Sequence, residues 1–151
     1  MPSRLHRGVT LAELLVALII VATLAVLAVP THRMQLARVR RAEARAALLS
    51  IAAAQESHHY ACRTYARSLD PAAASSCDAG ALPLPTAAAD GAYEISIVDA
   101  DASYWSATAT VLADGAQRAD EDCRAFGLDS QGRRTAHDVR GRDSSATCWR
   151  G

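Results

Sequence analysis

One carboxylate interrupts a stretch of the chain that is otherwise apolar enough for a lipid bilayer. Residues 9–29 are apolar except for Glu13 and two threonines. Glu13 calls for a cationic partner, because a charge costs roughly 2.5–3.5 kcal/mol at the centre of a membrane helix and somewhat less near its end. Gly8 follows a short basic leader, and hydrolysis of the bond after Gly8 would free a positive amine on Val9. The same amine on a neighbouring chain is a suitable partner for Glu13.

The cysteines are the second set of candidate functional residues. All four lie in the polar part of the chain: Cys62, Cys77, Cys123 and Cys148. Their even number, their wide spacing and the lack of a C-x-x-C pair favour two disulfides in an oxidising compartment over a zinc site. Free buried thiols are the alternative. Four cysteines allow three connectivities, and a Cys62–Cys77 bridge would tie the loop between them to the end of the preceding helix.

Other reactive side chains give weaker patterns. His58 and His59 are adjacent, so on a helix they point about 100° apart and chelate a metal poorly. The acidic run 120–122 lacks the spacing of an EF-hand calcium loop. His58 and Asp70 could form a catalytic pair, but nothing fixes them, and no nucleophile triad, phosphate loop or HExxH motif occurs. We therefore expect no enzymatic activity, no metal and no cofactor.

Length and charge limit the organisation further. The 151 residues leave room for one anchor and one small domain. All 16 basic residues are arginine, and the formal net charge is zero, so the global charge does not indicate nucleic-acid binding.

The apolar stretch has the length of a membrane span. A helix over residues 9–29 would be about 31 Å long, close to the ~30 Å hydrocarbon core. The alternative is a secretory signal peptide cut near residues 26–28, but its apolar part is usually only about 7–15 residues long. More arginines follow the stretch than precede it, which by itself favours the opposite membrane orientation.

The region after Pro30 predicts a second helical half. Pro30 removes a backbone donor and should bend the helix, while residues 31–60 contain no further Pro or Gly. We predict that a sheet covers an apolar face with three- and four-residue spacing: Val39, Ala42, Ala46, Leu49 and Ala53. A stripe of Arg38, Arg41 and Arg45 beside it is interpreted as a solvent-exposed face, with contact to neighbouring subunits as the alternative.

The rest of the chain predicts a loop and then a sheet. Residues 61–92 are rich in Ala, Ser and Pro and should form a long loop. About four antiparallel strands follow, over residues 93–98, 104–111, 123–128 and 133–137. The fold class is therefore α+β, with the long N-terminal helix packed on a C-terminal antiparallel sheet.

The N-terminus resembles that of a type IV prepilin. The resemblance rests on the segment Arg7-Gly8-Val9-Thr10-Leu11-Ala12-Glu13-Leu14, on the apolar helix after it and on Pro30. It implies that a prepilin peptidase cuts between Gly8 and Val9, that Val9 is N-methylated, that Glu13 acts in assembly and that Pro30 kinks the helix. The chain departs from most members of the family in having Val9 in place of phenylalanine, and Ala22 where many have glycine, which disfavours an abundant major subunit.

The same resemblance implies a division of the chain and the type IV pilin fold. The parts are a leader peptide (1–8), an apolar transmembrane and filament-core helix (9–29) and a periplasmic head domain (30–151). The head would contain the helix continuation 31–60, the loop 61–92, and the sheet with a disulfide loop, 93–151.

A second resemblance lies near the C-terminus. Cys123, the run Phe126-Gly127-Leu128-Asp129-Ser130-Gln131-Gly132-Arg133-Arg134-Thr135 and Cys148-Trp149 are similar to the C-terminal region of minor pilins of the PilE kind. In those proteins a disulfide closes a surface loop at the C-terminus, which implies a Cys123–Cys148 bridge here.

Together the two resemblances predict a minor type IV pilin, a structural subunit for pilus assembly that acts in adhesion and twitching motility. Its expected partners are other pilin subunits, the prepilin peptidase and the assembly machinery of the bacterial inner membrane. The expected location is single-pass in that membrane, with the head in the periplasm, and then the extracellular pilus. Two alternatives remain: a pseudopilin of a type II secretion system, and a membrane-anchored periplasmic binding domain outside any filament.

Overall fold

The chain begins with one long helix. The computed structural model describes residues 10–73 and 76–150, apart from the side chains of residues 26–33. Contacts divide the chain into two units, Met1–Leu36 and Ala37–Gly151, and each is described here by itself. Helix α1 (Leu11–Cys62) begins in the first unit and ends in the second, without interruption at Pro30. Its boundaries lie within two residues of the predicted ones.

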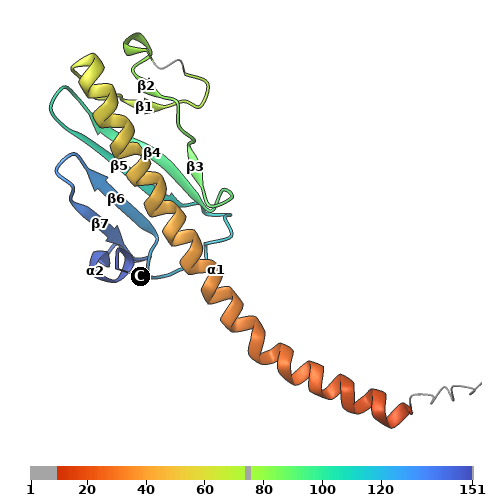
Figure 1. Ribbon diagram of the computed structural model, residues 1–151. Coiled ribbons are helices and arrows are strands. Elements are labelled where there is room, and N and C mark those ends of the chain that lie inside the picture. Colours follow the sequence, from red (N-terminus) through yellow and green to blue (C-terminus); the bar gives the residue numbers. More distant parts are fainter. Residues whose placement is uncertain (1–9, 74–75, 151) are drawn as a thin grey trace, which may run out of the picture. The chain divides into compact units, whose positions relative to one another are not determined.

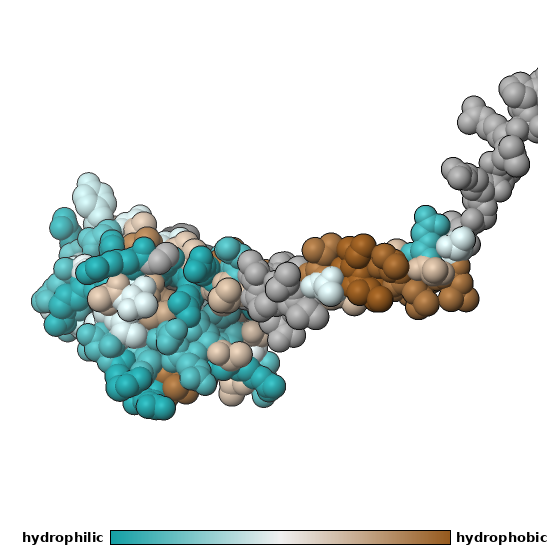
Figure 2. Space-filling model, turned by 90° about the horizontal axis from the view of Figure 1, so that it is seen from below, coloured by the Kyte–Doolittle hydropathy of each residue, from teal (hydrophilic) through white to brown (hydrophobic). Residues whose placement is uncertain are grey.

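The part of α1 in the first unit exposes its apolar side chains. Nine large apolar residues between Leu11 and Leu24 are 51–78 % exposed, and Figure 2 shows a mostly brown, hydrophobic surface along this part of the helix. Thr10 starts the helix, since its Oγ1 accepts a hydrogen bond from the Glu13 amide at 3.2 Å. Among the residues described, no helix meets the combined length and hydropathy expected of a membrane span.

The second unit contains two sheets (Figure 1). The larger sheet is antiparallel, with the order β3-β4-β5-β6-β7. Its strands are β3 (Ala87–Ala88), β4 (Tyr93–Ala100), β5 (Trp105–Val111), β6 (Ala125–Asp129) and β7 (Arg134–His137). The smaller sheet pairs β1 (Ser68–Leu69) with β2 (Ala81–Leu82) in parallel. A 3-10 turn, η1 (Cys77–Ala79), and a short helix, α2 (Ser145–Cys148), complete the unit. Four of the five strands of the larger sheet match the predicted ones within two residues.

The helix face that packs on the sheet differs from the predicted one. Ala44, Leu48 and Ile51 are at most 1 % exposed and contact a core that includes Tyr93 and Trp105. The predicted face over Val39, Ala42, Ala46, Leu49 and Ala53 is exposed, so that prediction was wrong. Alanine and leucine occur on several sides of this helix, so apolar spacing alone fits more than one face.

The predicted loop 61–92 is more ordered than expected, since it contains β1, η1, β2 and β3. Gln55 holds its start. The Gln55 side chain is fully buried, donates to the Ala66 carbonyl and accepts from the Ala66 amide, both at 2.8 Å. This polar residue takes a core position because both its amide groups are paired.

Candidate functional site

The predicted processing and assembly residues lie at the start of the chain. Gly8 and Val9 are outside the residues that the structure describes. Glu13 is in the first turn of α1 and is exposed. A carboxylate there is favoured by the unpaired amides at a helix N-terminus, and it remains open to a partner from another chain. Pro30 lies within α1, and the predicted bend at Pro30 remains a prediction.

Two disulfides close loops in the second unit, and they are the pairs that the sequence analysis anticipates. Cys62–Cys77 joins the end of α1 to η1, and Cys123–Cys148 joins the start of the β6 region to α2. The first is near the surface, with Cys77 exposed. The second is buried, because Cys123 and Cys148 are 0 % and 2 % exposed.

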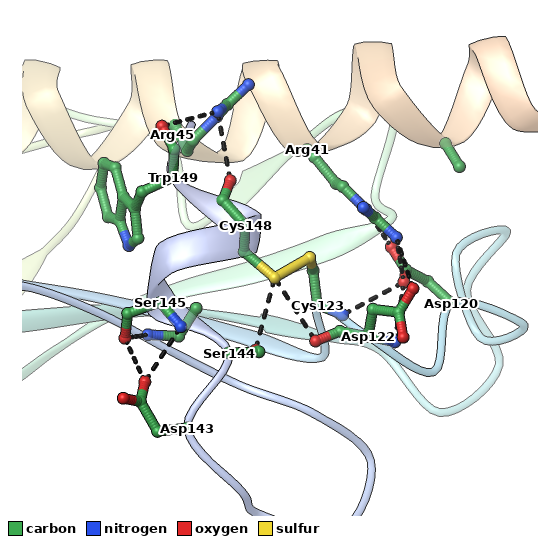
Figure 3. Close-up of a disulfide and its surroundings, with 12 residues drawn as sticks. Arg41, Arg45, Asp120, Asp122, Cys123, Asp143, Ser144, Ser145, Cys148 and Trp149 are labelled. Carbon is green, nitrogen blue, oxygen red and sulfur yellow. Dashed lines mark hydrogen bonds and ion pairs between the residues drawn. A yellow bond between two sulfur atoms is a disulfide. The ribbon is translucent and has the colours of Figure 1, made fainter. Parts of the chain in front are cut away.

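Arg41 connects helix α1 to the loop before Cys123 (Figure 3). Its Nε and Nη2 donate to the two carboxylate oxygens of Asp120, each at 2.6 Å. Asp120 also accepts from the Gln117 side chain at 2.7 Å and from the Cys123 amide at 3.1 Å. Burial alone would raise the pKa of Asp120, but these bonds, with the one from Arg41 the largest, outweigh it and hold the pKa below its ordinary value.

Arg45, one turn further along α1, holds the C-terminal tail. Its Nη1 donates to the carbonyl oxygens of Cys148 at 3.1 Å and of Trp149 at 3.2 Å (Figure 3). The interpretation of the arginine stripe as a solvent-exposed face was therefore wrong for Arg41 and Arg45, and right only for Arg38, which is exposed. Arg41 and Arg45 together anchor both sides of the Cys123–Cys148 disulfide to the helix.

Charge is unevenly distributed across the second unit, although the whole chain is neutral. Residues 68–122, which contain β1 to β5 and the loop after β5, carry ten acidic side chains and one arginine, whereas residues 123–151 carry six arginines and three aspartates. The sheet order places β3 and β7 at opposite edges, and Figure 1 shows β7 and α2 on the other side of α1 from β3. The β7 edge, defined as residues 133–150, carries five arginines and two aspartates, and the backbone of Glu121 and Asp122 contacts it.

Two of the five arginines of the β7 edge are in ion pairs, Arg133 with Asp129 and Arg142 with Asp138, and the other three are free to bind a ligand. Arg134, Arg140 and Arg150 are exposed and make no ion pair with any described residue. The Arg134 guanidinium carbon lies 5.3 Å from the centre of the Trp149 ring, which is a cation–π arrangement. Trp149 is fixed in turn, because its Nε1 donates to the Thr135 carbonyl at 2.8 Å. The edge therefore offers positive charge on a rigid aromatic support, which suits an anionic ligand.

The remaining candidates from the sequence do not come together as a site. His58 Nδ1 lies 3.9 Å from Cys62 Sγ, whereas Asp70 accepts the Ala72 amide at 2.9 Å, so each has its own local contact. In the acidic run, the Asp120 carboxylate is occupied by Arg41. No group of three or more metal-ligating side chains occurs among the described residues.

Three features were not predicted from the sequence: the Arg41–Asp120 pair, the buried Gln55 and the uneven distribution of charge across the second unit. The charge distribution had a visible signal, since a single arginine among ten acidic residues over positions 68–122 can be counted from the sequence. The other two depend on which helix face meets the sheet, and the composition of α1 does not determine that face.

Comparison with known families gives two matches. A model described as type IV minor pilin ComP, DNA uptake sequence receptor, matches residues 30–127. A model of the prokaryotic N-terminal methylation motif matches residues 3–29. A search of curated proteins finds no significant match.

Proposed function

The chain belongs to the type IV minor pilin ComP family, and on that premise we propose that it is cut after Gly8, methylated on Val9 and built into a type IV pilus. Residues 9–29 anchor it in the bacterial inner membrane before assembly, with the head in the periplasm. Other pilin subunits and the prepilin peptidase are its partners. Its role is structural and needs no enzymatic activity. The methylation-motif match over residues 3–29 and the α+β head support this proposal.

The observation that carries the proposal is the exposed apolar surface of α1 in the first unit. Side chains such as Leu11, Ile19 and Leu24 are each more than 60 % exposed. A contiguous apolar surface of this kind is unstable in water and marks contact with lipid or with other helices. A bundle of such helices in a filament core would cover it, and Glu13 would pair with the Val9 amine of a neighbouring subunit to set the register.

Two substitutions test processing and assembly separately. Gly8→Ala should leave the leader attached and remove the protein from sheared pili. Glu13→Leu should leave processing intact but prevent normal assembly, because the amine of the neighbour loses its partner. Thr23→Val is the matched control, since the Thr23 hydroxyl bonds only to the carbonyls of Ile19 and Ile20 in its own helix. Normal assembly of Glu13→Leu would support a plain membrane-anchored binding domain instead.

We further propose that the pilus subunit binds DNA. The family is described as a DNA uptake sequence receptor, and the β7 edge supplies exposed arginines, which are the side chains that contact phosphates. Among these arginines, Arg134 has its guanidinium held over the Trp149 ring. The family match ends at residue 127, before this edge, so the edge is an independent observation in favour of the same ligand.

Gel-shift titration of duplex DNA at several salt concentrations tests the proposed DNA binding. Arg134→Ala should weaken binding and reduce the slope of log K against log salt by about 0.9, the value for one lost phosphate contact on duplex DNA. Arg67→Ala is the control, because Arg67 is also exposed but lies next to β1. Equal effects of the two substitutions would remove the β7 edge as the DNA surface.

Adhesion and twitching motility are the cellular roles that we propose for the assembled pilus. A strain that lacks the gene should lose twitching while secretion continues. Loss of secretion with normal twitching would identify a secretion pseudopilin.

A further inference from the structure

The two disulfides differ in access by solvent. The sulfur atoms of Cys123 and Cys148 are buried beneath α1, and Cys148 Sγ lies 3.4 Å from the Asp122 carbonyl and from the Ser144 hydroxyl. In contrast, no residue of η1 is buried, so Cys77 is exposed. An external thiolate can therefore approach Cys77 directly, whereas it cannot reach the second disulfide without opening the head.

Cys62, the other cysteine of the exposed disulfide, has a histidine beside it that makes Cys62 a better leaving group. His58 lies four residues before Cys62 on α1, and its Nδ1 is 3.9 Å from Cys62 Sγ, within hydrogen-bond range for sulfur. His58 Nε2 is buried without a partner in the described structure. The sulfur of a disulfide carries no hydrogen, so a hydrogen bond between these two atoms requires the ring tautomer in which Nδ1–H is the donor. A hydrogen bond from Nδ1–H stabilises a thiolate on Cys62, and a stabilised thiolate is the better leaving group.

The chain on both sides of this disulfide is held by bonds that do not depend on it. Gln55 clamps Ala66 with two hydrogen bonds. The Arg67 amide donates to the Gly80 carbonyl at 2.8 Å, and the Asp70 amide donates to the Leu82 carbonyl at 2.9 Å. Opening the bridge would therefore free η1 from the end of α1, and the sheet and core would remain in place.

We propose that Cys62–Cys77 is a thiol–disulfide exchange site, at which an external dithiol attacks Cys77, His58 assists the departure of Cys62, and η1 is released from the end of α1. In the first step a thiolate of the dithiol bonds to Cys77 Sγ. The Cys62–Cys77 bond breaks, and its electron pair goes to Cys62 as thiolate. The second thiol of the reductant then attacks its own sulfur in the mixed disulfide and frees Cys77. The protein gains two electrons and two protons, and the reductant leaves as a disulfide.

The first test compares the two disulfides in the full chain in detergent. The protein is treated with dithiothreitol for short times, quenched with acid, alkylated and mapped by mass spectrometry. Alkylation of Cys62 and Cys77 should be about tenfold faster than that of Cys123 and Cys148, because of the difference in access. Equal rates, or faster opening of the buried bridge, would overturn the proposal.

The second test locates the attack. Reduced glutathione, a monothiol, should leave its adduct on Cys77 and a free thiol on Cys62. An adduct mainly on Cys62 would contradict the assigned direction. Hydrogen exchange after reduction should increase at η1 and not in the larger sheet, and an increase through β4 and β5 would show that the bridge holds the whole second unit and would contradict the proposal.

The third test addresses His58 as a positioning residue. His58→Phe keeps an aromatic ring but loses the donor, and should slow opening about threefold through the poorer leaving group. His58→Asn places an amide donor near the position of Nδ1 and should restore most of the rate. His59→Phe is the control, because His59 stacks on Tyr65 and does not contact the disulfide. An unchanged rate in His58→Phe would remove His58 from the exchange step.

Discussion

Replacement of Arg41 by methionine is the most informative test of how the head is held together. The guanidinium makes two hydrogen bonds of 2.6 Å to Asp120, whose side chain is 3 % exposed, while that of Arg41 is 22 % exposed. Breaking a fully buried pair from one side costs about 3–5 kcal/mol. Since Arg41 is partly exposed and Asp120 keeps its bonds to Gln117 and Cys123, we expect a loss of about 2–3 kcal/mol in unfolding free energy.

Thermal unfolding followed by circular dichroism measures this loss. For a unit of this size it corresponds to a decrease in Tm of roughly 8–12 °C. Arg38→Met is the matched control, because Arg38 is exposed one turn earlier on the same helix, and it should change stability by less than about 0.5 kcal/mol. A double-mutant cycle of Arg41→Met with Asp120→Asn should give a coupling energy of at least about 1.5 kcal/mol. Additive effects, or equal effects at positions 38 and 41, would refute the reasoning.

Three further predictions concern the same unit. The pKa of Asp120 is lower in the folded state than in the unfolded state. Its contribution to stability is therefore fully present above the unfolded pKa of about 4 and is lost as the pH falls through the folded-state pKa. The difference in Tm between wild type and Asp120→Asn should accordingly shrink below about pH 4. Gln55→Leu leaves both backbone groups of Ala66 unpaired and should cost about 2–3 kcal/mol in urea unfolding, while Ser50→Ala, an exposed change on the same helix, should cost almost nothing. Replacing Cys123 and Cys148 together by serine should lower the unfolding free energy by about 3.5 kcal/mol in the same assay, because the unfolded chain loses its loop-closure constraint. Wild-type stability of this variant would contradict a stabilising role of the disulfide that holds the C-terminal segment.

Much of the fold follows from local sequence patterns. The alternation of β4 and β5 and the turn residues before β7 predict those strands, and the absence of Pro and Gly after Pro30 predicts the helix that continues there. These features depend on residues that are close in the chain. The short strands β1, β2 and β3 were missed because each is only two residues long and so shows no alternating pattern of its own.

The packing of α1 could not be predicted in the same way. A helix with alanine on several sides gives no clear apolar face, and the choice of Ala44, Leu48 and Ile51 is made by the sheet. Arg41 and Arg45 resemble surface residues in sequence, but Asp120 and the carbonyls of the C-terminal tail, about 80 and 100 residues away along the chain, pair with them. Long-range polar pairing of this kind leaves no local signal.

Mass spectrometry of the N-terminus of the protein in purified pili tests the central claim most directly. The account predicts a chain that begins at Val9 and carries one methyl group on its amine. A mature chain that begins at Val29, as after cleavage of a signal peptide, or one that retains residues 1–8 within the pilus, would contradict it.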